Sequence, residues 1–195
     1  MTVENFDFIC GDGELEYGYI PGNEKVVFIK AGLGGDYRGY ENKYLKIARL
    51  LNQKHGCTVI SVSNPYEKPF GVADDRAILE KILQKFGFEN PDLYLFGNSD
   101  GCRKGLTLAS EVYFRRMILV NMPLTINLHR TRRYLSLIPD TDVIAVYVEK
   151  YVSYPYAALL EGKSERVRVI RVPDADHNFA GKTKDFIALS EKLLV

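Results

Sequence analysis

The stretch from Leu93 to Cys102 constrains the fold more than any other part of this chain of 195 residues. Leu93 to Phe96 are all apolar or aromatic, as expected of a strand buried on both faces of a parallel sheet. Gly97-Asn98-Ser99-Asp100-Gly101 follows directly and fits the pattern Gly-x-Ser-x-Gly. Residues 103–112 then have the apolar spacing of a helix. The stretch therefore predicts a strand, a sharp turn and a helix in direct succession.

Two interpretations of this turn differ in the part played by Ser99. In the first, a β-carbon on either side of the serine would clash with neighbouring backbone, and Ser99 is held in a strained conformation above the sheet. In the second, the glycines serve the packing of an ordinary turn and the serine caps the following helix. The strand-turn-helix context favours the first interpretation, in which Ser99 is a nucleophile.

Strands and helices alternate along almost the whole chain. Strands are predicted at 14–20, 25–30, 57–62, 93–96, 116–121, 143–148 and 167–172. Helices are predicted at 44–52, 72–86, 103–112, 156–161 and 182–194, whereas the segment 122–139 has no clear pattern. This alternation predicts an α/β fold with a mostly parallel central sheet flanked by helices on both faces. Ligands of such sheets bind at the carboxyl ends of the strands, where Ser99 falls.

The composition bounds the class of protein. With 46% hydrophobic and 26% charged residues, and with no repeat or linker, residues 1–195 are expected to form one domain. The net charge of +1 gives no general attraction to nucleic acid or to an anionic membrane. The 3 cysteines do not suit a disulfide framework, and the acidic N-terminus lacks the layout of a signal peptide. We therefore expect a reduced, cytoplasmic protein without nucleic-acid or membrane partners, whose oligomeric state the sequence leaves open.

A serine hydroxyl needs a base within hydrogen-bond reach before it acts as a nucleophile. Of the 3 histidines, His177 is the best candidate, because its polar loop follows the last predicted strand at the same edge of the sheet as Ser99. His55 precedes a strand and falls at the opposite edge. His129 belongs to the basic cluster His129–Arg133, which suits a solvated face or an anion-binding surface. His177 is thus the predicted general base, and the alternative is a merely solvated loop histidine.

The glycine turn after residues 25–30 is a candidate oxyanion site. Gly32-Leu33-Gly34-Gly35 can expose backbone N–H groups, and we predict that the amides of Leu33 and Asp100 hold the oxyanion, with Gly32 and Gly34 beside them. A phosphate loop is the weaker interpretation, because the third glycine of a dinucleotide fingerprint is absent and no Gly-Lys-Ser/Thr follows. No His/Cys/Asp cluster has ligand spacing, so neither a metal nor an organic cofactor is predicted.

These features together resemble the α/β-hydrolase fold family. The resemblance comprises the nucleophile elbow at Ser99, the oxyanion turn at Gly32-Leu33-Gly34-Gly35 and the late Asp176-His177-Asn178-Phe179, in the order that the family uses. It implies a serine hydrolase, similar to carboxylesterases or thioesterases, that cleaves a small ester, thioester or amide through an acyl-enzyme. The short chain implies a compact member without a large cap domain, whose site is open or covered only by residues 122–139. Acyl transfer to an acceptor other than water stays open.

The acid of the expected triad is the least determined part of the resemblance. The family usually carries it just past the penultimate strand, in a pattern like Gly-Glu-Lys-Asp, where this chain has Val148-Glu149-Lys150-Tyr151. Some members carry it one strand earlier, where this chain has Asn121. Glu149 is then the candidate that orients His177. Because loss of the acid costs several powers of ten in rate, a non-catalytic, hydrolase-like binding protein is the alternative.

Asp100 suggests a further hypothesis, since it follows the proposed nucleophile directly. Its negative charge would favour substrates that carry a cationic group. The alternative is that this carboxylate complements the dipole of the helix that begins here.

Overall fold

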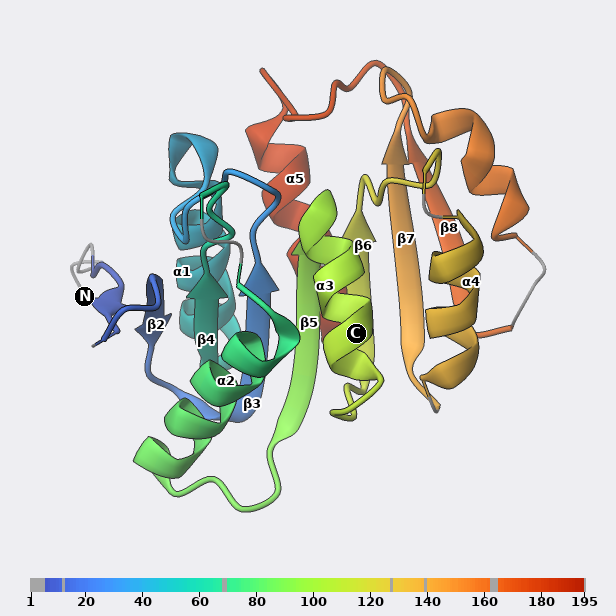
Figure 1. Ribbon diagram of the computed structural model, residues 1–195. Helices are drawn as coiled ribbons and strands as arrows, with labels where there is room; N and C mark the ends of the chain where they lie inside the picture. Colours follow the sequence, from blue (N-terminus) through green and yellow to red (C-terminus); the bar gives the residue numbers. More distant parts are fainter. Residues whose placement is uncertain are drawn as a thin grey trace.

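The computed structural model describes residues 6–11, 13–67, 70–126, 128–138, 140–161 and 165–194. Its centre is an eight-stranded sheet in the order β1-β2-β4-β3-β5-β6-β7-β8 (Figure 1). The strands are β1 (Ile9–Cys10), β2 (Tyr17–Ile20), β3 (Asn23–Lys30), β4 (Cys57–Val62), β5 (Asp92–Asn98), β6 (Arg116–Val120), β7 (Asp142–Val148) and β8 (Val167–Val172).

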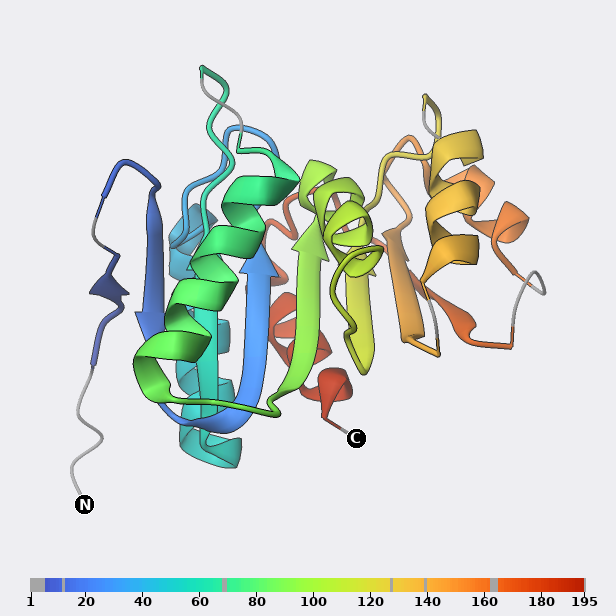
Figure 2. The same cartoon turned by 60° about the horizontal axis from the view of Figure 1, so that its bottom comes forward.

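Helices cover both faces of this sheet, as Figures 1 and 2 show. The helices are α1 (Lys43–His55), α2 (Val72–Phe86), α3 (Asp100–Ala109), α4 (Leu128–Leu137) and α5 (Thr183–Leu189), with 3₁₀ turns η1 (Tyr40–Asn42), η2 (Tyr154–Leu159) and η3 (Ser190–Leu193). One face packs against α2, α3 and α4, and the other packs against α1 and α5. None of the described helices is both long and apolar enough to cross a bilayer.

The strand directions confirm the predicted mostly parallel sheet. At one edge of the sheet, the short strand β1 is antiparallel to β2, and β2 is antiparallel to β4. The other six strands, β4, β3, β5, β6, β7 and β8 in their order across the sheet, run parallel to one another. In the centre, Val26 of β3 pairs with Leu93 of β5, and Lys30 pairs with Gly97. This register brings the carboxyl ends of β3 and β5 together, so that the turn after β3 lies beside the turn that contains Ser99.

The core consists of two apolar layers, one on each side of the sheet. Val26 and Phe28 of β3 face the layer under α2 and α3, whereas Val27 and Ile29 face the layer under α1 and α5. Successive side chains of a strand point to opposite faces, so a strand buried on both faces needs a continuous apolar run. This requirement explains why the central strands could be recognised from sequence.

Most differences from the sequence predictions concern the ends of elements and weakly patterned segments. The structure places α4 in the segment 122–139, of which Asn127 and Pro139 lie outside the described residues. The short helix predicted at 156–161 is a 3₁₀ turn that begins at Tyr154, and the last helix gives way to 3₁₀ geometry at Ser190. Strand β1 was not predicted, because its two residues are exposed and its only signal is backbone pairing with β2.

Candidate active site

Ser99 is the single residue between the end of β5 and the start of α3. Its backbone has φ 53° and ψ −123°, a strained conformation for a residue other than glycine. Two hydrogen bonds hold it there: its N–H donates to the Val120 carbonyl at 2.8 Å, and its carbonyl accepts from the Cys102 N–H at 3.0 Å. The strained turn that the sequence predicted is therefore present.

The glycines on either side of Ser99 are required by close backbone contacts. A β-carbon on Gly97 would lie 2.9 Å from the Cα of Cys102. One on Gly101 would lie 2.3 Å from the carbonyl oxygen of Lys30. Backbone atoms cannot move aside as flexible side chains do, so any larger residue at position 101 would displace α3 from the end of β3. This finding favours the nucleophile interpretation of the turn over an ordinary helix cap.

A small pocket opens beside Ser99, with a volume of about 170 Å³. The residues that line it come from the turn after β3, the start of α1, the end of β5 and the loop after β8; they are Gly32, Leu33, Gly34, Gly35, Gly39, Tyr40, Lys43, Tyr44, Asn98, Ser99, His177 and Asn178. The structure thus brings the predicted residues Ser99 and His177 to one pocket, together with the glycine turn. A larger hollow of about 370 Å³ is lined by residues of α4, β7 and β8 and includes none of the predicted site residues.

The predicted oxyanion donors have free N–H groups. Within the described residues, the N–H groups of Leu33 and Asp100 donate to no other group. By contrast, the Gly34 N–H donates to the Asn64 carbonyl at 2.7 Å, so Gly34 lines the pocket without offering a donor. A β-carbon on Gly32 would lie 3.1 Å from the Cβ of Ser99, which shows how closely the turn approaches the serine.

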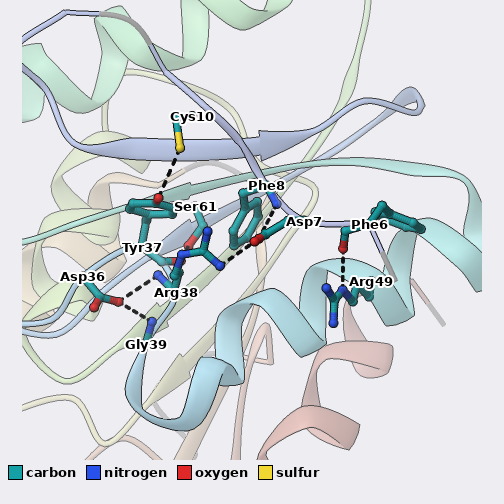
Figure 3. Close-up of polar contacts among 10 residues, drawn as sticks. All are labelled: Phe6, Asp7, Phe8, Cys10, Asp36, Tyr37, Arg38, Gly39, Arg49 and Ser61. Atoms are coloured by element: carbon teal, nitrogen blue, oxygen red, sulfur yellow. Dashed lines mark hydrogen bonds and ion pairs between the residues drawn. The ribbon is translucent and has the colours of Figure 1, made fainter. Parts of the chain in front are cut away.

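The loop between this turn and α1 is anchored by the N-terminal strand region, as Figure 3 shows. Asp36 accepts hydrogen bonds from the backbone N–H groups of Arg38 and Gly39, at 2.8 and 2.6 Å. The Arg38 guanidinium forms an ion pair with Asp7 at 2.8 Å. The Tyr37 hydroxyl and the Cys10 thiol lie 3.3 Å apart, within hydrogen-bond distance. These contacts fix the loop that connects the oxyanion turn to α1. Both the turn and the first residues of α1 line the pocket.

His177 is held by its backbone and by stacking. The Asn121 side chain donates to the His177 carbonyl oxygen at 3.1 Å, and the Tyr151 ring lies 4.5 Å from the imidazole, centroid to centroid. Burial lowers the pKa of His177, as does the positive charge of Lys43, while Asp176 acts in the opposite direction. The imidazole is therefore neutral, as a general base must be, over a wider pH range than that of an exposed histidine.

The structure does not bring the third predicted catalytic residue, Glu149, to the histidine. The Glu149 side chain is exposed, and its carboxylate accepts a hydrogen bond from the Asp174 N–H at 2.9 Å. The Nδ1 atom of His177, which a triad acid would bind, is buried without a hydrogen-bond partner within the described residues. Residue 149 lies just beyond the end of β7, where its side chain turns outward to brace the loop after β8.

Two other carboxylates near the site accept hydrogen bonds from groups other than His177. Asp176 accepts hydrogen bonds from the N–H groups of Asn178 and Ala180, at 3.0 and 2.9 Å, and so shapes the histidine loop. Asp100 accepts from Arg103 at 2.9 Å and from Asn64 at 3.2 Å. Because both oxygens of Asp100 already have partners, the structure gives no support to the hypothesis that this carboxylate selects cationic substrates.

Sequence reasoning missed Lys43, a charged residue of the pocket. Its side chain is only 4% exposed, and burial lowers its pKa to about 8, with Asp176 acting in the opposite direction. The helix was predicted to begin one residue later, so nothing in the local pattern separated Lys43 from an ordinary surface lysine. Within the described residues, no group of three or more His, Cys, Asp or Glu side chains is arranged to hold a metal ion.

Comparison with known proteins defines the fold. No protein-family model matches the sequence, and no curated protein is similar to it in sequence. An α/β serine hydrolase without a lid from Xanthomonas campestris has a TM-score of 0.66 at 19% identity, covering 96% of this chain and 91% of its own. Dienelactone hydrolase from Anabaena variabilis has a TM-score of 0.68 at 15% identity, covering 96% and 94%.

Est1E from Butyrivibrio proteoclasticus is similar to the same extent, with a TM-score of 0.68 at 11% identity over 96% of this chain and 97% of its own. Est1E has also been solved with ferulic acid bound. Identities this low establish the fold alone. The chain therefore has the α/β-hydrolase fold in a small form without a cap, as its sequence resemblance implied.

Proposed function

We propose that this protein is a serine hydrolase, which cleaves a small ester, thioester or amide with Ser99 as nucleophile and His177 as general base. The observation that carries the proposal is the strained Ser99, which lines one small pocket together with His177 and the oxyanion turn. The volume of about 170 Å³ supports a small acyl group, because pockets for drug-sized ligands measure roughly 300–1,000 Å³.

The proposed reaction has two steps. The Ser99 hydroxyl oxygen bonds to the substrate carbonyl carbon while His177 accepts the hydroxyl proton, and the N–H groups of Leu33 and Asp100 stabilise the oxyanion. The imidazolium then gives the proton to the leaving alcohol, thiol or amine as its bond breaks. Water attacks the acyl-enzyme in the same way, which releases the acid and restores the serine.

In this proposal His177 acts without a triad acid. Its ring is held by stacking on Tyr151 and its backbone by the Asn121 amide. These contacts fix its position, yet neither offers a negative charge to stabilise the imidazolium. We therefore expect slower turnover than a complete triad provides, because loss of the acid costs up to about 10⁴ in rate in serine proteases.

The alternative function is a non-catalytic binding protein with an incomplete triad. The buried Nδ1 atom of His177 favours it, because this atom has no hydrogen-bond partner within the described residues. Tyr151, whose ring lies against His177, stands at the sequence position where the family usually carries its acid. The free oxyanion donors and the strain at Ser99 favour the enzyme, since a binding protein needs neither.

Labelling with a fluorophosphonate probe separates the two functions. The purified protein should label stoichiometrically at Ser99, and the variants Ser99→Ala and His177→Ala should not label. Glu149→Gln is the matched control, which should label at the wild-type rate because this carboxylate does not reach the histidine. A folded wild-type protein that does not label would overturn the proposed enzyme, and slower labelling of Glu149→Gln would restore Glu149 as the orienting acid.

A further inference from the structure

The pocket beside Ser99 has a distinct electrostatic character. Of the residues that line it, Lys43 is the only one charged at pH 7, because its pKa of about 8 keeps it protonated there and the lowered pKa of His177 keeps that ring neutral. The carboxylate of Asp100, in the neighbouring turn, is paired with Arg103 and Asn64. A substrate that enters the pocket therefore meets a site with one positive charge.

Lys43 is buried and forms no ion pair with any residue that the structure describes. Its side chain is 4% exposed, yet within the described residues its ammonium forms neither a hydrogen bond nor an ion pair. It lies over the rings of Phe186 and Tyr44, at 4.4 and 5.4 Å from their centroids. Aromatic faces attract a cation but accept none of its N–H groups as a carboxylate does. The Nζ atom is not among the described polar atoms that are buried without a partner, so its N–H groups are open to a ligand at the pocket.

The chain makes room for this lysine. Gly39 has a positive φ of 70°, and a β-carbon there would lie 2.5 Å from the Tyr44 ring and 3.0 Å from the Lys43 side chain. Asp176, the acidic group whose charge acts on Lys43, accepts two backbone N–H groups at Oδ1 and forms no ion pair with the lysine within the described residues. Burial of an ammonium is costly unless it is paired and hydrogen-bonded. An anion that entered the pocket would therefore form an ion pair with Lys43 that none of the described residues forms.

We propose that Lys43 binds a carboxylate of the substrate, so that the preferred substrates are small esters or thioesters carrying a carboxylate a few atoms from the scissile carbonyl. Monoesters of short dicarboxylic acids belong to this class. The inference rests on the proposed serine hydrolase and narrows its substrate. Lys43 takes no part in bond making or breaking, and hydrolysis of such a monoester yields the dicarboxylate and an alcohol.

The test compares esters that differ only in charge. Monomethyl succinate carries the carboxylate on the acyl side, and methyl succinamate is its neutral amide isostere. O-acetylglycolate carries the carboxylate on the alcohol side, and O-acetylglycolamide is its neutral counterpart. Rates of hydrolysis at pH 7 are followed by proton NMR for the wild type, for Lys43→Met and for Lys46→Met, an exposed lysine of the same helix that serves as control.

We expect the wild type to favour the charged ester of at least one pair by about 10- to 100-fold in kcat/KM, since hydrogen bonds to charged groups contribute about 1.5–3 kcal/mol. The preference for the charged ester should disappear in Lys43→Met and persist in Lys46→Met. If only one of the two ester pairs shows this preference, that pair tells whether Lys43 binds a carboxylate on the acyl side or on the alcohol side of the ester. In Lys43→Met the loss should be larger for the charged ester than for its neutral counterpart, whereas Lys46→Met should hydrolyse both at the wild-type rates.

Two outcomes would overturn the inference while the proposed hydrolase stands. One is equal turnover of charged and neutral esters by a wild-type protein whose Ser99 labels with fluorophosphonate. The other is an equal loss for both esters in Lys43→Met, which would place the ammonium at the reacting carbonyl. Absence of labelling in the folded wild type would overturn the hydrolase itself, and the substrate inference with it.

Discussion

Replacement of Lys43 by methionine should stabilise the folded protein. Methionine has a similar length and no charge, so the substitution keeps the packing against Phe186 and removes a buried ammonium that has no counter-ion within the described residues. A residue retained for binding at the expense of stability is a common feature of functional sites. The size of the gain follows from the pKa of this lysine.

Burial lowers the pKa of Lys43 from 10.5 to about 8. One pKa unit corresponds to 1.36 kcal/mol, so the charged form costs about 3 kcal/mol of stability at pH 7. Because the pKa is lower in the folded state, the unfolded chain binds more protons between pH 8 and 10.5, and wild-type stability rises with pH through that window. The advantage of Lys43→Met should therefore be largest below pH 8 and vanish above pH 10.5.

Urea unfolding at a series of pH values between about 6 and 11 measures this difference. The chain has 0 tryptophans, so far-ultraviolet circular dichroism is the suitable signal. Lys46→Met is the control, and a surface substitution of this kind should change the free energy of unfolding by no more than about 0.5 kcal/mol at any pH. A pH-independent difference between wild type and Lys43→Met, or a less stable variant, would refute the assignment of a buried, unpaired ammonium.

Three further substitutions test the elbow and the histidine. Ser99→Gly should raise the free energy of unfolding by about 1–3 kcal/mol while it abolishes labelling, because glycine adopts the φ of 53° without strain; an unchanged or lower value in urea unfolding would contradict this. Gly101→Ala should slow labelling by at least about tenfold, because the added β-carbon would lie 2.3 Å from the Lys30 carbonyl oxygen and displace the turn. Labelling at the wild-type rate would show that the backbone can shift without disturbing Ser99. Tyr151→Asp should raise kcat by about tenfold or more, because a carboxylate supports the His177 imidazolium. It should also raise the pKa of His177, which burial lowers in the wild type, and so move the acidic limb of kcat/KM to higher pH; an unmoved limb would argue against contact.

The control for Gly101→Ala is Gly71→Ala. Gly71 has an ordinary φ of −81°, and the nearest atom to an added β-carbon is a side-chain oxygen of Asp74 at 3.6 Å. Since that distance is ordinary van der Waals contact, labelling of this variant should match the wild type. A loss as large as that of Gly101→Ala would mean that labelling reports general destabilisation rather than the geometry of the elbow.

The features that could be predicted from the sequence are those that depend on neighbouring residues along the chain. Apolar runs located the central strands, and β4, β8 and α2 begin and end at the predicted residues. The elbow is local as well, because the sharp turn needs glycines within two residues of Ser99. The position of His177 at the same edge of the sheet as Ser99 also follows from the order of elements along the chain. His177 comes after the last strand, and the carboxyl ends of parallel strands share one edge.

Which side chains contact one another depends on the three-dimensional fold and could not be predicted from the sequence. Glu149 fits the sequence position of a triad acid nearly as well as Tyr151, yet one braces a loop and the other stacks on His177. Lys43 looks like a surface lysine until α5 brings Phe186 over it and the loop after β8 closes the pocket. The direction of a side chain and its burial depend on elements far away in the chain, and no local pattern records them. For this reason the strained turn at Ser99 was predictable, whereas the position of Glu149 away from His177 and the burial of Lys43 were not.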